Sequence, residues 1–275
     1  MNVLIPLTKK ELEYFFDLNS QKVINFFINK SLFSQPELVN KQKKLPIQIP
    51  KEHLEQWIVQ ALNVKPIGAG SYPVDVVGVN WAADIKMISC KLDKNGDLTN
   101  GDSGETSLAQ KFSDSIFGKT TLDNLFKEEK YEFILDKWLE IFKEKYDILV
   151  KDYPNVKSTY YFIVLRAGSK FYLTGLKVEL NNLENVTLDK KRTTSKSIFE
   201  NGFIDKKYGY CKIYKSKKRL ELRLKPKKWV EEERVLTFDT EFKLNETNIK
   251  EIVKNNNLKK YVKELINKIF DINLE

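Results

Sequence analysis

The chain has 275 residues, of which 41% are hydrophobic and 31% charged, and its formal net charge at pH 7 is +9. This hydrophobic fraction predicts a packed core and excludes global disorder, and the length suits one large domain or two modest ones. The sequence has no run of about 18 apolar residues, so we expect no membrane span. A basic balance of this kind is typical of proteins that bind polyanions.

Cysteine and histidine are scarce, which narrows the possible chemistry. Cys90 and Cys211 are far apart in the sequence and form no disulfide framework, and this usage fits a reducing, cytoplasmic compartment. Together with the single His53 they cannot build a Cys/His zinc site, and a Ser-His-Asp triad would need His53 as its base. Residues 1–16 lack the charge and apolar pattern of a secretory signal, so we expect none.

The N-terminal part predicts two helices joined by a connector. Residues 8–34 place apolar side chains three and four positions apart, and Thr8 with Glu11 forms a capping box at the start. Residues 35–50 contain three prolines and are expected to connect the helices without regular structure. Residues 51–62 form the second predicted helix.

A β-hairpin is predicted over residues 72–90, where two stretches rich in strand-forming residues flank a short turn. If the turn consists of residues 79–80, the register places Asp75 directly across from Asp84. Lys86 follows two positions after Asp84 and therefore points to the same face of the sheet. The hairpin thus predicts two carboxylates and an ammonium at one place.

Three further elements are expected in the middle of the chain. Ser107 and Gln110 form a second capping box, which predicts a short helix that ends near residue 117. Residues 122–150 read as one long amphipathic helix, whose aromatic side chains we expect in the core. Residues 159–180 predict a strong hairpin with a glycine-containing turn.

The part after residue 180 is basic and has short β-like alternations. Between residues 205 and 228, eleven Lys and Arg residues face two acids. This asymmetry predicts contacts with a phosphate backbone, with Arg219 and Arg223 as candidate base readers, whereas the alternative is a solvated β face. The candidate DNA-binding residues are Lys212, Lys215, Lys217, Lys218, Arg219, Arg223 and Lys225. Residues 245–270 predict a closing helix.

The predicted hairpin is apolar except for three charged side chains, which need a stabilising partner if they are buried. Facing Cβ atoms in a hairpin lie about 5 Å apart, so Asp75 and Asp84 repel each other unless a cation lies between them. Lys86 can serve in part, and a divalent ion that prefers oxygen ligands serves better. Such a Mg²⁺ would polarise a phosphate and acidify a bound water, which Lys86 would orient. The alternative, a structural salt bridge of Lys86 with one aspartate, leaves the other acid unexplained.

The stretch P-V-D at 73–75, followed by D-I-K at 84–86, resembles the signature of the PD-(D/E)xK nucleases. This family includes type II restriction endonucleases and MutH-like nicking enzymes. The resemblance covers residues 50–92 and extends to about residue 180 only by the order of elements. It departs from the family name at Val74, which separates Pro73 from Asp75.

The resemblance implies a role for each matched residue. Asp75 corresponds to the first metal ligand, Asp84 to the second and Lys86 to the catalytic lysine. Many members add an acid or amide from the preceding helix, for which Glu55 is the first candidate and Gln60 the second. The family also implies a mixed sheet flanked by helices, Mg²⁺-dependent DNA cleavage and, commonly, a dimer.

Other acid-x-Lys triplets occur in this lysine-rich chain, at 128–130, 189–191 and 205–207. They fall on a charged helix or in polar runs, where a solvated surface explains them. The stronger rival is Asp239, Glu241 and Lys243, which alternate onto one strand face but lack a facing carboxylate on a near strand. We therefore prefer the site at residues 75–86.

Taken together, these patterns predict an α/β (α+β) fold with a mixed central sheet flanked by helices and a basic, β-rich C-terminal part. Residues 1–180 would form a nuclease core and residues 181–275 a DNA-contacting region, either separate or continuous with the core. The predicted function is sequence-specific cleavage of double-stranded DNA by a Mg²⁺-dependent, cytoplasmic, homodimeric type II restriction enzyme without an organic cofactor. The alternatives are a MutH-like nicking enzyme and a non-catalytic DNA-binding protein.

Overall fold

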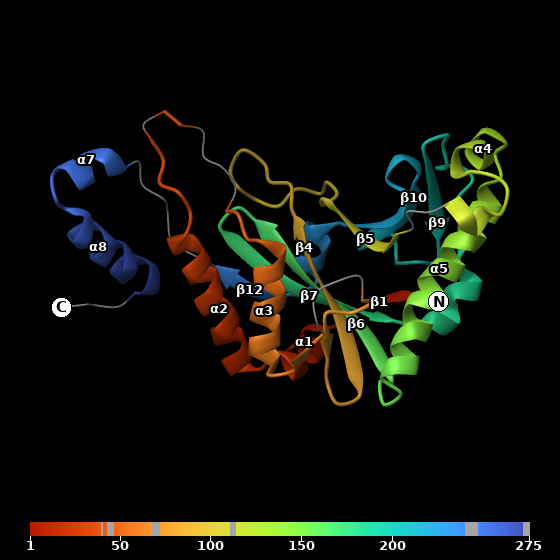
Figure 1. The fold of residues 1–275 in the computed structure, drawn as a ribbon, viewed down its shortest axis with the longest axis horizontal. Helices are drawn as coiled ribbons and strands as arrows, with labels where there is room; N and C mark the ends of the chain where they lie inside the picture. Colours follow the sequence, from red (N-terminus) through yellow and green to blue (C-terminus); the bar gives the residue numbers. More distant parts are fainter. Residues whose placement is uncertain (40, 43–46, 68–71, 111–113, 240–246, 272–275) are drawn as a thin grey trace.

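Two β-sheets organise the computed structural model, and helices cover both faces of the larger sheet (Figure 1). The structure describes residues 1–39, 41–42, 47–67, 72–110, 114–239 and 247–271. None of the helices in these ranges is both long and apolar enough to cross a membrane.

The larger sheet has seven strands and is mixed. Its order is β1-β7-β6-β4-β3-β2, and β12 also pairs with β7. Only the pair β4–β6 is parallel among the pairings of this sheet, in the described residues. The strands are β1 (Leu4–Pro6), β2 (Lys65–Pro66), β3 (Val76–Val77), β4 (Trp81–Ser89), β6 (Ser158–Ala167), β7 (Lys170–Val178) and β12 (Leu236–Asp239). The expected mixed sheet flanked by helices is confirmed.

Side chains of β4 alternate between two separate cores, because successive residues of a strand point to opposite faces. Ala82 and Ile88 pack in the core that contains α5 (Tyr131–Asp152), and this side is called the α5 face below. Ala83 and Ile85 pack in the core that contains α3 (Lys51–Leu62), which is called the α3 face. Position 84 therefore belongs to the α5 face.

The Thr8 cap and the bounds of the second predicted helix are confirmed, but the first predicted helix is divided in two. Residues 8–34 form two helices, α1 (Lys9–Phe15) and α2 (Leu18–Phe33), with the Thr8–Glu11 capping box in place. The break occurs because Asp17 starts a new helix by accepting a hydrogen bond from the Ser20 N–H at 2.8 Å. Helix α3 has the predicted bounds and stops at Asn63, which adopts the left-handed conformation.

Two predictions for the middle of the chain are corrected. The capping-box residues lie in strand β5 (Glu105–Gln110) and not at a helix start, because this segment pairs with strand β11 (Arg219–Leu224), and the tertiary pairing overrides a local capping pattern. Of the helix expected to end near residue 117, residues 111–113 lie outside the described residues and Asp114–Phe117 is a 3₁₀ segment. The long helix over residues 122–150 is two helices, α4 (Leu122–Lys127) and α5. They are separated at Glu129, whose φ of 54° cannot continue a right-handed helix.

The smaller sheet has the order β5-β11-β10-β9-β8. Its remaining strands are β8 (Thr187–Leu188), β9 (Ser197–Asn201) and β10 (Gly209–Tyr214), and helix α6 (Pro226–Glu231) follows β11. Short 3₁₀ segments lie at Asp114–Phe117, Leu180–Asn185 and Lys215–Lys217. The short β-like alternation expected after residue 180 is present in β11, where Leu220, Leu222 and Leu224 are buried in one core.

The two sheets interleave along the chain. Strand β5 from the first half joins the smaller sheet, and β12 from the last part returns to the larger one. A split at residue 180 therefore does not separate the sheets. The expected closing helix is a pair, α7 (Ile249–Lys254) and α8 (Leu258–Phe270), with Asn256 at a φ of 57° between them. This pair lies beside α2 at the end of the molecule opposite the smaller sheet (Figure 1).

Candidate active site

The hairpin of β3 and β4 places the candidate acids. Val76 pairs with Ala83 and Val77 with Ala82, and the Gly78 N–H donates to the Trp81 carbonyl oxygen at 2.8 Å. The turn therefore consists of residues 79–80, as predicted. This register brings the residue before β3 next to position 84 on β4.

Asp75 lies just before β3 and reaches across to β4. Ala83 is the register partner of Val76, yet its carbonyl oxygen accepts a hydrogen bond from the backbone N–H of Asp75 at 2.9 Å. Asp75 therefore lies outside the regular ladder of β3 and β4. Its side-chain Oδ2 accepts a hydrogen bond from the Ile85 N–H at 2.6 Å. The predicted neighbourhood of Asp75 and Asp84 is thus present, although a local irregularity produces it rather than a straight facing pair.

Asp84 is buried on the α5 face and is bonded by two lysines. Its Oδ1 accepts a hydrogen bond from the ammonium of Lys86, as the strand spacing predicts. Its Oδ2 accepts a hydrogen bond from Lys145 Nζ of α5 at 2.8 Å. Burial alone would raise the pKa of Asp84, but the charges and hydrogen bonds of Lys145 and Lys86 lower it to about 2. Asp84 is therefore ionised at neutral pH.

The environment of Asp75 has the opposite effect. Burial and the adjacent negative charge of Asp84 raise the pKa of Asp75, and the net result is a value of about 7. The Ile85 N–H and the Lys86 charge lower it in part. Neighbouring carboxyls with one raised and one lowered pKa are common at functional sites. Such a pair costs stability, so it is uncommon where its only role is structural.

Lys145 is the member of this cluster that the sequence analysis did not identify. Its ammonium donates to Asp84, to the Leu108 carbonyl oxygen at 3.3 Å and to the Tyr161 hydroxyl at 3.2 Å. Tyr146 donates to the same Tyr161 hydroxyl at 2.8 Å. Burial would lower the pKa of Lys145, but the charge of Asp84 raises it overall, so the ammonium stays protonated.

A signal for Lys145 exists in the sequence. Trp138, Ile141, Phe142 and Leu149 form the buried stripe of α5, and position 145 follows Ile141 by four residues. A lysine on the apolar stripe of a helix requires a partner in the core. That pattern indicates a buried ion pair, but it does not indicate which acid is the partner of the lysine.

Neither Glu55 nor Gln60 joins the cluster. Helix α3 packs against the α3 face through Leu54 and Ile58, in the same core as Ala83 and Ile85. Because Asp84 points to the other face of β4, the helix that precedes the hairpin covers the wrong side of the sheet for the predicted contact. The expectation of a third acid from residues 51–62 is therefore corrected.

The candidate DNA-binding residues are found largely in internal ion pairs. Glu221 is buried and accepts from Arg219 Nε at 2.8 Å, with Lys217 at 3.7 Å and Lys212 at 3.9 Å. Glu105 of the neighbouring strand pairs with Arg223 at 2.7 Å. In this part, the cations of the expected solvated or DNA-facing row on β11 are paired with two acids, Glu105 and Glu221.

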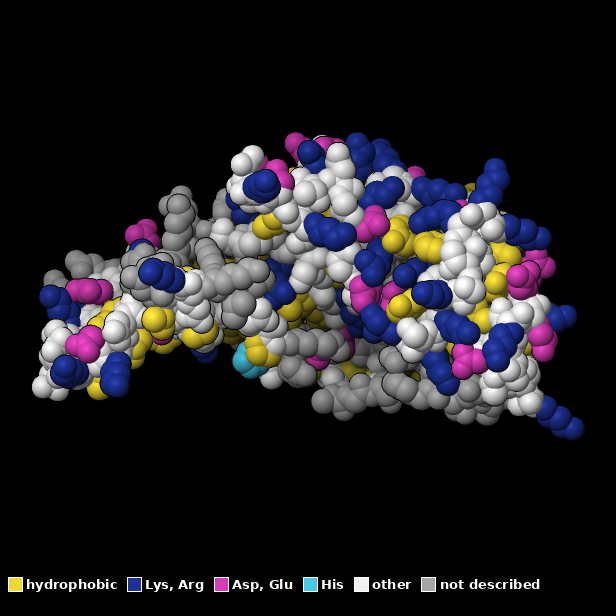
Figure 2. Space-filling view, turned by 90° about the horizontal axis from the view of Figure 1, so that it is seen from above, with side chains coloured by type: hydrophobic (Ala, Val, Ile, Leu, Met, Phe, Trp, Pro, Cys, Tyr) yellow, Lys and Arg dark blue, Asp and Glu magenta, His cyan; other side chains and the backbone are white. Residues whose placement is uncertain are grey.

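The remaining predicted cations differ in their surroundings. Lys215 pairs with Asp123 at 3.0 Å, and Lys225 donates to the carbonyl oxygen of Lys206 at 2.6 Å. Lys218 adopts a φ of 46° at the end of the Lys215–Lys217 turn. Figure 2 shows many lysine and arginine side chains on the visible side of the half of the molecule that holds the smaller sheet. A basic surface is therefore present there, although part of the predicted row on β11 is paired with acids.

The rival acid motif lies mostly outside the described residues. Asp239 is the last residue of β12 and pairs with Lys170 of β7, whereas Glu241 and Lys243 belong to residues 240–246, which the structure does not describe.

The donor set at the hairpin fits Mg²⁺. In the described ranges, no group of three or more His, Cys, Asp and Glu side chains could hold a metal ion. A metal at Asp75 and Asp84 would thus have two protein carboxylates, which is the number that Mg²⁺ usually takes beside water and phosphate. Each carboxylate oxygen has two lone pairs, so an oxygen that already accepts one hydrogen bond can still bind a cation.

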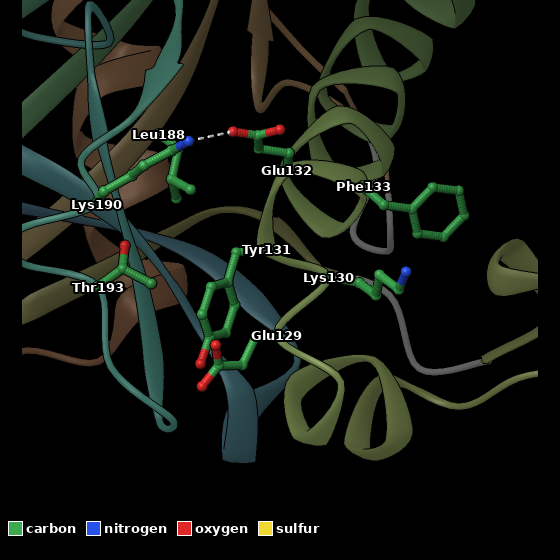
Figure 3. A pocket seen from close by; sticks show the side chains of 8 residues that line it. All are labelled: Glu129, Lys130, Tyr131, Glu132, Phe133, Leu188, Lys190 and Thr193. Atoms are coloured by element: carbon green, nitrogen blue, oxygen red, sulfur yellow. Dashed lines mark ion pairs between the residues drawn. The ribbon is translucent and has the colours of Figure 1, made fainter.

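A separate hollow of about 580 Å³ lies where the α4–α5 junction meets the segment after β8 (Figure 3). Lys190 and Glu132 form an ion pair of 3.0 Å across it. Its other lining residues are Glu129, Lys130, Tyr131, Phe133, Leu188 and Thr193. None of these residues belongs to the carboxylate cluster, so this hollow is not part of the candidate site.

Comparisons with known proteins identify no relative: no family model matches the chain, and neither a curated protein nor a solved structure is significantly similar to it. The likeness of residues 73–75 and 84–86 to the PD-(D/E)xK signature therefore depends on the local residues and their geometry.

Proposed function

We propose that this protein is a divalent-metal-dependent nuclease of the PD-(D/E)xK type that hydrolyses phosphodiester bonds in double-stranded DNA. The observation that carries the proposal is the convergence of the Asp75 and Asp84 carboxyls and the Lys86 ammonium at one hairpin of a mixed sheet. Sequence-specific cleavage by a homodimer, as in type II restriction enzymes, is the form of this activity that the signature implies.

A purely structural role explains the cluster less well. A salt bridge between Asp84 and its two lysines would be complete without Asp75. The described residues provide no salt bridge for Asp75, and its burial beside another carboxylate raises its pKa, so this acid costs stability as the pH rises above its unfolded value of 3.8 toward 7. A cation placed between the two acids would remove this cost, which favours a metal-binding role.

The roles of the residues follow from their positions. Asp75 and Asp84 would hold the metal ion. When bound, such an ion supplies Lewis acidity toward a phosphate and lowers the pKa of a bound water. Lys86 projects to the face of Asp84, and its ammonium would orient the attacking water or stabilise negative charge on the phosphate.

The substrate class follows from charge. The chain carries a formal net charge of +9, and many basic side chains lie on the side of the smaller-sheet half that Figure 2 shows. Such a surface attracts a polyanion without reading its sequence. The alternative of a non-catalytic DNA-binding protein that uses the β11 row alone is weakened, because Glu105 and Glu221 already neutralise much of that row.

The test is cleavage of unmodified phage DNA by the purified protein in Mg²⁺ and in EDTA, beside Asp75→Asn and the matched control Glu55→Gln. Discrete fragments that require Mg²⁺ and Asp75, but not Glu55, would support the proposal. Nicks without double-strand breaks would favour the MutH-like alternative. DNA binding without cleavage under either condition would contradict the nuclease and support the non-catalytic alternative.

A further inference from the structure

The inference concerns Lys145, a buried cation that the proposed chemistry leaves unused. We propose that Lys145 is a fixed counter-cation of the metal site, which prevents tight metal binding until a phosphate of the substrate arrives. This proposal rests on the proposed function. The role of Lys145 goes beyond the proposed function, because it makes metal binding depend on DNA binding through a residue outside the signature.

Lys145 is held more firmly than Lys86. Its ammonium bonds to Asp84, to a backbone carbonyl oxygen and to the Tyr161 hydroxyl, and it lies 5.1 Å from the centre of the Tyr161 ring. The described structure gives Lys86 one such bond, to Asp84. A cation held by Asp84 would therefore compete more easily with Lys86, which has one such hydrogen bond to lose, than with Lys145, which has three.

The formal charges explain why this matters. With both aspartates ionised, the two carboxylates and two ammonium groups sum to zero, so a divalent ion gains little net attraction from the site. A DNA phosphate adds negative charge and oxygen ligands at the same place. Binding of the phosphate would then raise the affinity of the site for the metal, and binding of the metal would raise the affinity for the phosphate by the same factor.

Removing the Lys145 charge should uncouple metal binding from DNA. Lys145→Met keeps a long side chain but leaves the site with an excess of negative charge. We expect this variant without DNA to bind Mn²⁺ at least tenfold more tightly than the wild type, as measured from the free-ion signal in electron paramagnetic resonance. Lys145→Arg retains the charge and should bind Mn²⁺ like the wild type. A merely structural role would leave the affinity unchanged or lower it.

A second measurement uses the wild-type protein alone, so it does not depend on how a variant folds. The affinity for a labelled fragment of phage DNA is measured by fluorescence anisotropy in Ca²⁺ and in EDTA at equal ionic strength. We expect at least a tenfold gain in Ca²⁺. Tight Mn²⁺ binding by the free wild type, together with equal DNA affinity in Ca²⁺ and EDTA, would overturn the inference.

The outcomes also separate this inference from the proposed function. If the wild type binds Mn²⁺ tightly without DNA and Asp84→Asn abolishes that binding, the metal site stands and only the role of Lys145 is wrong. If neither the wild type nor Lys145→Met binds Mn²⁺, with or without DNA, the proposed nuclease itself is contradicted.

Discussion

Two regions of this molecule bring acids and cations together, and they do so in different proportions: four cations with two acids on β11 and its neighbours, and two lysines with two acids at the β3–β4 hairpin. On β11 and its neighbours, Glu105 and Glu221 lie among Lys212, Lys217, Arg219 and Arg223. On the β3–β4 hairpin, Asp75 and Asp84 lie beside each other, and both lysines bond to Asp84 alone.

The difference bears on the roles proposed for the two regions. In the β11 network, each acid is paired with cations, so the arrangement can hold two strands together. At the hairpin, the two acids repel each other inside the protein. Such repulsion is typical of sites that bind a cation, which is the role proposed for Asp75 and Asp84.

The largest effect is expected at Asp75. Asp75→Asn removes one proposed metal ligand, so Mg²⁺-dependent cleavage should fall by about 10³-fold or more. The same change removes the repulsion with Asp84, so the urea midpoint of unfolding should not decrease. A parallel loss of cleavage and stability would instead assign Asp75 a structural role. Both quantities are measured on the same purified variant.

Lys86→Met should have a smaller effect on cleavage. The variant keeps both carboxylates, but it loses the ammonium that would orient water or stabilise charge, so we expect a loss of about 10²-fold in the single-turnover rate. Binding of DNA in Ca²⁺ should remain within a few-fold of the wild type. Unchanged cleavage by this variant would remove Lys86 from the mechanism.

Glu221→Gln tests the other side of the comparison. The change leaves Arg219, Lys217 and Lys212 without a buried acid, so the free energy of unfolding should fall by about 1–3 kcal/mol. The cleavage rate should be unaffected at a temperature where the variant is folded. Urea denaturation gives the stability, and a cleavage defect in the folded variant would place the β11 network in the active site.

Glu200 on β9 offers the smallest effect and a dependence on pH. It is 4% exposed, its two side-chain oxygens have no hydrogen-bond partner among the described residues, and burial raises its pKa well above 4.5. The folded protein therefore holds this proton at a pH where the unfolded chain has lost it. The resulting loss of wild-type stability begins near the unfolded pKa, about 4.5, and grows as the pH rises.

Glu200→Gln removes this proton and its pH dependence. Relative to the wild type, the variant should gain about 1 kcal/mol or more of unfolding free energy between pH 5 and pH 8. Urea denaturation at the two pH values measures the change. An equal difference between variant and wild type at both values would show that Glu200 is ionised in the folded state.

Local patterns predicted some features well. The capping box at Thr8, the bounds of α3, the turn at residues 79–80 and the hairpin of β6 and β7 depend on neighbouring residues and are confirmed. Breaks within helices were missed. Asp17 and Glu129 interrupt patterns that remain apolar at helical spacing on both sides, so periodicity alone does not reveal the break.

The sequence alone is enough to bring two Asp residues and a Lys together, because their spacing across a two-residue turn fixes their register. Which helix faces them depends on the tertiary structure. Helix α3 packs on the other face of the sheet from Asp84, and α5 supplies Lys145, which is 61 residues from Asp84. The reason is that strand alternation is local, whereas the choice of the helix that covers each face depends on long-range packing.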